Sequence, residues 1–521
     1  MRRELTKYLR LPTMSRMETG AVLSRRPAVV GGLLLILMLL TGLGWAVSSP
    51  VESSPDDNYH LGSIWCPRPA GESCQTSVVD GDPVVRVPIA VADESMRCYV
   101  LQSNKSAGCA LGYDDSHMVW SKRFDNGAYP IGYYHFHHLL VGKDVQTSVL
   151  VMRGVNVLIA VALLGTIGFC APRQLRRPFI GAIVASWVPM GVYFIASNNP
   201  SSWAVSGLMA YSAATFMAPQ QNGRRRIALV ICAVIGAVMC LTSRYDAAFF
   251  LLVVGLALLF AVPWKRGGWI GLSALAGVAL LGFGTFMASS QVSKVAYFLR
   301  VFEASDPAKS ADKQPFFEKL LVGLETAPKY LGGFWGHTWT PGWHDVPLGA
   351  RAPYVLTIMA AGAFVAVGLR RGGWRKWTAL AIIVGSMVLL PALFYANGAM
   401  DTIELYQARY IFPLLAPTFF LMLAVDQDEG AWFTVPQAVW VTVFISLCQT
   451  ITLHTLLLRF VQGAQERWEL DLNKHIEWWW SAPVSPMMVW FLTTCLATAA
   501  LGTAIAMLTR TAEKYEAPQE P

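Results

Sequence analysis

The chain has 521 residues, of which 54% are hydrophobic and only 14% are charged. A soluble globular protein carries about a quarter charged residues, so this composition excludes an ordinary soluble enzyme. The formal net charge of +8 does not indicate nucleic-acid binding, because the basic residues lie in short loops between apolar runs. The composition therefore predicts a polytopic membrane protein that binds lipids and no nucleic acid.

The first 27 residues are basic and precede the first long apolar run. Basic segments beside a membrane helix stay on the cytoplasmic side, so residues 1–27 are expected to form a cytoplasmic N-terminus. The apolar run at 28–48 is long enough to cross a bilayer. We interpret it as a retained first transmembrane helix rather than a cleaved signal peptide, whose apolar region is shorter.

The polar segment 49–146 follows this helix and is expected to be an extracytoplasmic lobe. Its residues 83–89 alternate in the manner of a short β-strand. Four cysteines on an oxidising side predict two disulfides, and the sequence leaves all three pairings open. A zinc site is the weaker alternative, because the spacing lacks a close cysteine pair. The four cysteines are Cys66, Cys74, Cys98 and Cys109.

Further apolar runs predict more transmembrane helices, separated mostly by basic loops on one side. These runs are 147–170, 179–196, 203–218, 227–242, 247–263, 269–288, 352–369, 377–396, 410–425, 432–456 and 487–508. They predict an all-α membrane protein of about twelve helices with both termini, including the tail 509–521, in the cytoplasm. Helices 2–7 fill 147–288, an extracytoplasmic segment with interfacial helices spans 289–351, and helices 8–12 fill 352–508 around an outer segment at 457–486.

Several polar residues recur at one predicted depth, on the extracytoplasmic side. Ionisable groups near hydrocarbon are expensive, and they usually face a cavity or a partner. An arginine binds phosphate bidentately and a carboxylate accepts a proton from a hydroxyl, so we predict an acid/base site for an anionic substrate. Its candidate catalytic residues are Asp56 and Asp57, and its candidate substrate-binding residues are His60, Asn199, Arg244, Asp246, Trp343, His344, Gln407 and Arg409. The alternative is that the two arginines are interface residues that pair with nearby acids.

Five short motifs occur in a fixed order along the chain. They are Ser54-Pro55-Asp56-Asp57-Asn58-Tyr59-His60, the segment from Tyr129 to Tyr134, Asn199-Pro200-Ser201-Ser202, Gly342-Trp343-His344-Asp345 and Gln407-Ala408-Arg409-Tyr410-Ile411-Phe412-Pro413. This ordered set resembles a family of bacterial polytopic membrane proteins known only as a domain of unknown function. That family in turn resembles the GT-C glycosyltransferases, and the resemblance covers most of the chain.

The resemblance implies a glycosyltransferase of the bacterial plasma membrane that uses a polyprenyl-phosphate sugar as donor. It implies Asp56 or Asp57 as general base, Arg409 or Arg244 as ligand of the donor phosphate, and an envelope glycan or glycolipid as acceptor. Two features depart from the family pattern: the second acid is Asp57 where the family usually has glutamate, and the insert from Cys66 to Cys109 is not typical.

The chain carries no Gly-rich nucleotide-binding loop, which suits a donor that is not a nucleotide. No cofactor is predicted, and a divalent metal is not indicated. Two other functions compete with the transferase. A transporter or flippase of envelope lipids or glycans would have broken helices and repeated halves, and an assembly scaffold would need none of the polar residues for chemistry.

Overall fold

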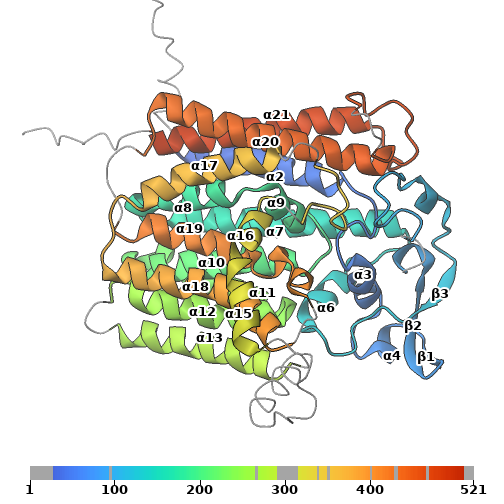
Figure 1. Cartoon of the computed structure of the whole chain (residues 1–521), viewed down its shortest axis with the longest axis horizontal. Coiled ribbons are helices and arrows are strands. Elements are labelled where there is room, and N and C mark those ends of the chain that lie inside the picture. The colour runs from blue at the N-terminus through green and yellow to red at the C-terminus, as the bar shows by residue number, and fades with distance from the viewer. Residues whose placement is uncertain are drawn as a thin grey trace, which may run out of the picture.

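The structure is a computed structural model that describes residues 27–92, 97–264, 268–289, 315–336, 339–348, 352–398, 402–426, 432–464 and 469–509. Apolar helices lie side by side in a bundle, and a smaller polar lobe covers one end of that bundle (Figure 1). The predicted cytoplasmic ends, 1–26 and 510–521, lie outside the described residues.

Seven helices of the described residues are long and apolar enough to cross a bilayer. They are α2 (Pro27–Ala46), α7 (Val145–Cys170), α11 (Gly223–Ser243), α13 (Trp269–Met287), α18 (Trp374–Ala396), α20 (Val435–Val461) and α21 (Pro486–Thr509). The prediction of a helical, multi-pass membrane protein is therefore confirmed. Every predicted apolar run falls on a helix, but several helices are shorter than a full span, so the count of twelve stays a prediction.

The shorter helices of the bundle are α8 (Arg173–Ser186), α9 (Pro189–Ile195), α10 (Ser201–Met217), α12 (Tyr245–Ala261), α17 (Ala352–Gly368) and α19 (Leu415–Ala424). The predicted helix 179–196 is not continuous, because α8 and α9 meet at an angle of 94°. Proline disfavours the α conformation of the residue before it, and Val188 before Pro189 is extended. With the bent pair counted as one span, eight helices of the described residues could cross a bilayer.

Helix α10 lies at the centre of the bundle, and sixteen of its seventeen residues are buried. It packs against α7, α11, α12 and α19. The contact with α11 is close because Gly207 and Gly236 face each other; a Cβ on Gly236 would lie 2.5 Å from the Gly207 carbonyl oxygen. This packing holds the first residues of α10 beside the polar lobe.

The lobe contains α3 (Asp57–Trp65), α4 (Ala70–Ser73), α6 (Gly132–His138) and a small antiparallel sheet of order β1-β2-β3. The strands are β1 (Thr76–Val79), β2 (Asp82–Pro88) and β3 (Met118–Ser121), so the strand predicted at 83–89 is confirmed. Asp80 and Gly81 between β1 and β2 both have positive φ, as a tight two-residue hairpin requires. Of the three open pairings, the structure joins Cys66 to Cys74 and Cys98 to Cys109.

Part of the segment predicted at 289–351 is also helical, as α15 (Phe316–Glu325) and α16 (Ala327–Gly333). Helix α15 packs on α18. Residues 290–314, with the amphipathic stretch 292–302, lie outside the described residues. Short 3-10 turns complete the fold: η1 (Ile89–Val91), η2 (Gly108–Gly112), η3 (Ala218–Gln220), η5 (Ile403–Leu405), η6 (Ala408–Tyr410) and η7 (Phe412–Leu414).

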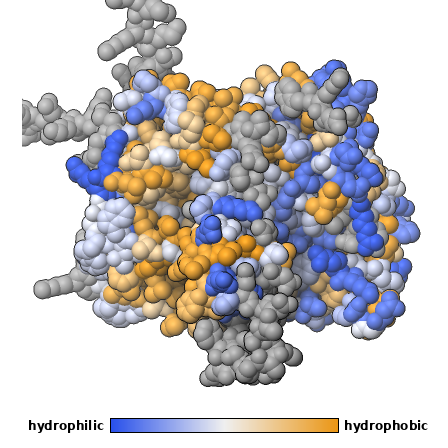
Figure 2. Space-filling view, in the orientation of Figure 1, coloured by the Kyte–Doolittle hydropathy of each residue, from blue (hydrophilic) through white to orange (hydrophobic). Residues whose placement is uncertain are grey.

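The bundle and the lobe also differ in the hydropathy of their surfaces. Figure 2 shows hydrophobic side chains over the helical bundle and hydrophilic ones gathered over the lobe. The loop from α2 to α3 and the turn η6 meet where the lobe joins the bundle, since Arg409 of η6 contacts Asp56.

Candidate functional site

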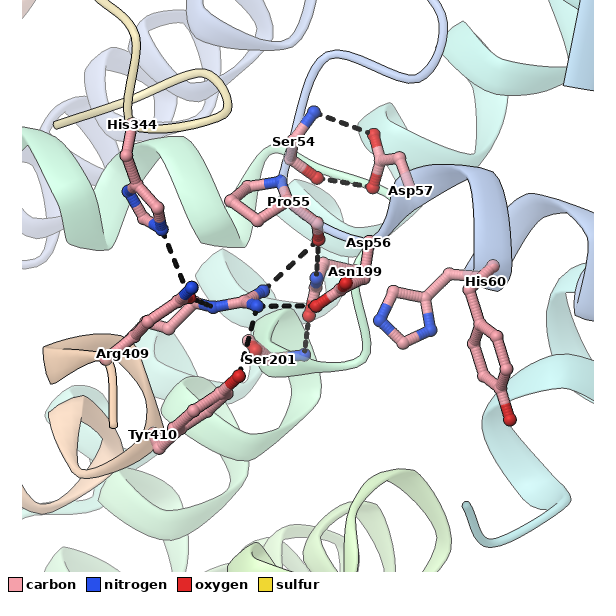
Figure 3. Close-up of polar contacts among 12 residues, drawn as sticks. Ser54, Pro55, Asp56, Asp57, His60, Asn199, Ser201, His344, Arg409 and Tyr410 are labelled. Carbon is pink, nitrogen blue, oxygen red and sulfur yellow. Dashed lines mark hydrogen bonds and ion pairs between the residues drawn. The ribbon is translucent and has the colours of Figure 1, made fainter. Parts of the chain in front are cut away.

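The loop Ser54-Pro55-Asp56 leads from α2 into α3. The side chains of the adjacent residues Asp56 and Asp57 point in different directions (Figure 3). Asp56 stands before the first residue of α3 with φ 64° and ψ 12°, a left-handed conformation that few residues other than glycine adopt. This backbone turn separates the carboxylate of Asp56 from that of Asp57. The two acids therefore have different surroundings and different chemistry.

Asp57 is fully buried and bonded to its own loop. One carboxylate oxygen accepts the backbone N–H of Ser54 at 3.1 Å, and the other accepts the Ser54 hydroxyl. Burial raises the pKa of Asp57 to about 6, although Arg153 and the bonds from Ser54 oppose that rise. Asp57 thus holds the loop in place and presents no free oxygen to a substrate.

Asp56 is half-buried, with 35% of its side chain exposed. Its Oδ2 accepts a bond from Nη2 of Arg409 at 2.5 Å, and its Oδ1 lies 3.7 Å from Nη2 of Arg123. Burial would raise the pKa of Asp56, but the positive charge and bond of Arg409 outweigh it, and the pKa is lowered. Asp56 is therefore an ionised, accessible carboxylate.

Arg409 reaches Asp56 from a turn more than 350 residues later in the chain. Its side chain is 2% exposed, and its remaining N–H groups donate to Gln407 Oε1 at 2.5 Å and to the Pro55 carbonyl at 3.2 Å. His344 Nε2 lies 3.1 Å from the same Gln407 oxygen. Gln407 thus orients Arg409, and His344 contacts the same Gln407 oxygen. Figure 3 shows His344 on the side of the Arg409 guanidinium away from Asp56.

A second arginine lies beside this pair. Arg244 stands between α11 and α12, donates two bonds to Asp246 at 2.8 and 2.6 Å, and donates a third to Ser201 Oγ at 3.1 Å. Its guanidinium lies over the rings of Tyr129 and Tyr410, 5.8 and 5.5 Å from their centroids. Arg409 lies 5.0 Å from the same Tyr410 ring, so one aromatic ring links the two cations.

These contacts bring Asp56, Arg244, Asp246 and Arg409 into one group. In both ion pairs the arginine is nearly buried and the carboxylate is partly exposed, 35% for Asp56 and 26% for Asp246. An anion that approaches this surface meets two carboxylates, each of which covers a guanidinium. Displacement of Asp246 would open two N–H groups of Arg244 for bidentate binding, and displacement of Asp56 would open Nη2 of Arg409.

His60 lies one helical turn after Asp56, and its backbone N–H donates to the Asp56 carbonyl at 3.0 Å. The imidazole is fully buried, with Nδ1 2.9 Å from the Tyr134 hydroxyl and the ring edge-on to Tyr129. Burial lowers the pKa of His60 to about 3, so the ring is neutral. Figure 3 shows the ring turned toward Asp56.

Two other predicted residues support the loop. Asn199 donates to the Pro55 carbonyl at 2.9 Å and accepts the backbone N–H of Ser201 at 2.9 Å, so it ties the Asp56 loop to α10. The indole N–H of Trp343 donates to the carbonyl of Glu52 at 2.8 Å. Both side chains lie next to the site, and these hydrogen bonds are made to the protein backbone.

Three residues that the prediction did not include contribute to the site. Tyr129 and Tyr410 occur in the quoted motifs, and for Tyr410 its place directly after Arg409 was the available signal. Arg123 lies in the lobe after β3, places its guanidinium 5.5 Å from the Tyr59 ring centroid and reaches Asp56. Nothing in the sequence near Arg123 indicates that role.

A fourth arginine is buried nearby but has a structural role. Arg153 of α7 donates to the carbonyls of Ala46, Ser49 and Pro50 at 2.7–3.1 Å and to Asn198 Oδ1 at 2.8 Å. These acceptors satisfy its guanidinium and fasten the end of α2 to α7. Among the described residues, no group of three or more histidines, cysteines or acids could hold a metal ion.

Comparison with known proteins gives one match. Residues 39–418 match the family described as "Predicted membrane protein (DUF2142)", a range that contains the whole candidate site. No curated protein and no solved structure matches the chain.

Proposed function

We propose that this chain, which belongs to the DUF2142 family of predicted membrane proteins, is a membrane glycosyltransferase of GT-C type. It would transfer a sugar from a polyprenyl-phosphate donor to a hydroxyl of an envelope glycan or glycolipid. The observation that supports this proposal is the accessible Asp56 carboxylate on the buried Arg409, with Arg244 linked to it through Tyr410. A carboxylate base and two phosphate ligands are the groups that the reaction needs.

The proposed reaction uses these groups in one displacement. Arg409 and Arg244 bind the donor phosphate, and Asp56 takes the proton of the acceptor hydroxyl. The acceptor oxygen forms a bond to the anomeric carbon while the bond from that carbon to the phosphate oxygen breaks. The electron pair of the broken bond stays on the phosphate, where the guanidinium charges stabilise it.

Asp56 and the donor phosphate would compete for Arg409. While the ion pair is closed, the guanidinium lowers the pKa of Asp56 and makes it a weak base. When a phosphate takes the guanidinium, the carboxylate loses that partner and its basicity rises. Donor binding would therefore prepare the base for the acceptor.

An apolar cavity beside the site suits part of a lipid chain. Its volume is about 80 Å³, and it is lined by residues of α2, α7, α8, α9, α10 and α19 together with Trp187 and Phe412. Phe412 follows Arg409 and Tyr410 in the chain, and α9 leads to Asn199. A lipid phosphate at the two arginines could thus place its first carbons between the helices.

The positions of the basic residues indicate which side of the membrane the site would face. Helix α7 starts at the lobe, where the Val145 N–H donates to Asp115, and ends before the basic residues Arg173, Arg176 and Arg177. Further basic residues stand at the starts of α11 and α18. Basic loops favour the cytoplasm, so the lobe and the site would face the extracytoplasmic side.

One observation favours a transporter or flippase instead. The pair α8–α9 is bent by 94° within an apolar region, and broken helices line the substrate sites of many transporters. A transporter would move a labelled polyprenyl-phosphate sugar across a vesicle membrane and form no new glycosidic bond.

The proposal is tested with the purified full chain in vesicles that contain a panel of polyprenyl-phosphate sugars and an envelope glycan fraction. Wild type should form a glycosylated product, and Asp56→Asn should lower the rate about 100-fold or more. Glu469→Gln, at an exposed acid of another segment, serves as the matched control and should keep the wild-type rate. Transfer by Asp56→Asn at the wild-type rate would show that Asp56 is not the base, and movement of the donor without product would favour the transporter.

A further inference from the structure

Six arginines gather at the end of the bundle that lies away from the polar lobe. Helix α7 begins at the lobe, and its 26 residues extend about 39 Å along the bundle to Cys170. Three of the arginines stand at the start of α8, directly after this end of α7, and three stand at the start of α11. We call them the arginine cluster: Arg173, Arg176, Arg177, Arg224, Arg225 and Arg226.

Hydrogen bonds hold the two halves of the arginine cluster beside the same end of α7. The side chain of Gln221, just before α11, donates to the Cys170 carbonyl at 2.9 Å. Arg176 of α8 donates to the Ala171 carbonyl at 3.3 Å, so its guanidinium also lies over this helix end. The charge of Arg225 on α11 acts on Arg176. The six arginines therefore form one cationic surface, although they come from two segments of the chain.

No acid compensates the charge of the arginine cluster. The sequence contains no aspartate or glutamate between Asp144 and Asp246. Among the described residues, the ion pairs include none of the six arginines. Basic loops that only orient a membrane protein need an excess of positive charge, but they do not need two loops to converge. The cluster is therefore suited to an anion.

An exposed apolar stripe on α11 leads up to the arginine cluster. Ile227, Ile231, Val234 and Val238 are 49–60% exposed, and their spacing of four, three and four residues places them on one face of the helix. Arg224 precedes Ile227 by three residues, so it lies at the end of this stripe. The stripe is about 16 Å long, close to the hydrocarbon depth of one leaflet, which is about 15 Å. Its length suits the acyl chain of a lipid whose phosphate lies at the arginines.

We infer that the arginine cluster binds the phosphate headgroup of an anionic phospholipid from the adjoining leaflet, and that an acyl chain of this lipid lies along the α11 stripe. Arg224 and Arg225 approach the headgroup from α11, and Arg173 and Arg176 approach it from α8. Guanidinium groups bind phosphate oxygens in pairs, and basic pockets between membrane helices recognise anionic headgroups. A zwitterionic headgroup brings its own cation and would be repelled in part. The inference does not rest on the proposed function.

Lipid binding to the full chain tests the inference. The chain is purified in detergent, stripped of lipid and titrated with phosphatidylglycerol or phosphatidylcholine, and bound lipid is counted by native mass spectrometry. Wild type should bind phosphatidylglycerol about tenfold more tightly than phosphatidylcholine. The triple variant Arg176→Gln/Arg224→Gln/Arg225→Gln should bind the two lipids equally. Ile231→Asn should weaken the binding of phosphatidylglycerol without removing the preference, because it changes only the stripe.

The matched control removes three arginines from another basic loop, between α17 and α18. Arg370→Gln/Arg371→Gln/Arg375→Gln has the same net charge as the triple variant and should keep the wild-type preference. If the triple variant does not fold, the single variants Arg224→Gln and Arg225→Gln replace it, and each should weaken the binding of phosphatidylglycerol several-fold.

Three results would overturn the inference. The first is equal binding of the two lipids by wild type, and the second is an equal loss of preference in the control, which would reflect net charge alone. The third is displacement of phosphatidylglycerol by an equal concentration of glycerol phosphate, which would show a site for a free anion rather than for a lipid. None of these measurements depends on sugar transfer, so the inference can fail without the proposed function and the reverse.

Discussion

Two arginine–aspartate pairs join late parts of the chain to earlier segments, and they differ in one property. Arg459 of α20 pairs with Asp345 at 2.7 Å, with side-chain exposures of 0% and 6%. Arg409 pairs with Asp56 at 2.5 Å, with exposures of 2% and 35%. The first pair is closed to solvent on both sides, whereas the second has an accessible acid. We therefore expect the Arg459–Asp345 pair to stabilise the fold. We expect the Arg409–Asp56 pair to open when a ligand takes the arginine.

The surroundings of each pair agree with that division. Arg459 also donates to the carbonyls of Tyr99 and Lys105 at 2.6 Å, and Asp345 accepts the Leu101 N–H at 3.1 Å. The closed pair thus holds the loop between Cys98 and Cys109 against the end of α20. The open pair has instead a second arginine, Arg244, linked to Arg409 through the Tyr410 ring, and the His60 nitrogen that has no hydrogen-bond partner among the described residues lies near Asp56.

The largest expected effect is on the closed pair. Asp345→Ala leaves Arg459 buried without a counter-charge, which should cost about 3–5 kcal/mol of unfolding free energy. Chemical unfolding of the purified chain in detergent measures this cost. Glu469→Ala is the control, because its pair with Lys474 is exposed on both sides and its loss should leave the unfolding free energy nearly unchanged. Similar costs for the two variants would show that the closed pair does not stabilise the fold.

The loop that the closed pair holds is itself cross-linked. Replacement of Cys98 and Cys109 by serine should lower the unfolding free energy by about 3 kcal/mol, because the unfolded chain gains the freedom of an opened loop of this length. The matched control is Cys495→Ser at an exposed free cysteine, which should be nearly neutral. If the double variant is as stable as the control, the loop is held by other contacts.

Asp57 should make stability depend on pH in a direction opposite to that of an ion-paired acid. Its folded pKa of about 6 lies above the ordinary aspartate value of 3.8, so the folded state binds more protons than the unfolded state between these values. The unfolding free energy should therefore fall as the pH rises from about 4 to about 6, by on the order of 2–3 kcal/mol. Asp57→Asn should remove this slope. Unfolding curves of wild type and variant at several pH values measure this slope. An unchanged slope in Asp57→Asn would show that Asp57 does not cause the pH dependence.

The smallest stability effect is expected at the open pair. Asp56→Asn keeps an acceptor oxygen near Arg409, and solvent reaches the position, so the cost should be about 1 kcal/mol. The comparison with Asp345→Ala under the same unfolding conditions measures the difference between the open and the closed pair. A cost as large as that of Asp345→Ala would mean that Asp56 is a structural residue.

Much of the fold was predictable because apolar length and basic loops follow simple physical rules. Most apolar runs form a single helix, the run 179–196 is divided between α8 and α9, and the alternating residues 83–89 form β2. The break before Pro189 was also open to prediction from the local rule for residues before proline. The continuous apolar composition of 179–196 nevertheless predicts one helix.

The site was predictable only in part. Isolated ionisable groups at one depth indicated that Asp56, Arg244 and Arg409 lie together, and the structure brings them together. The difference between Asp56 and Asp57 depends on a left-handed backbone turn that two adjacent identical residues do not encode. Arg123 reaches the site from a distant loop, and the disulfide pairing depends on the packing of the lobe, so neither leaves a local signal.

The most direct test of the central claim is the affinity of the full chain for an anion that competes with Asp56. Inorganic phosphate, and then a polyprenyl phosphate, would be titrated by calorimetry into wild type, Asp56→Asn and Arg409→Gln. If Asp56 occupies the place of a ligand phosphate, Asp56→Asn should bind either anion about tenfold more tightly, and Arg409→Gln should lose binding. Equal or weaker binding by Asp56→Asn would contradict the claim that Arg409 exchanges its own carboxylate for a substrate phosphate.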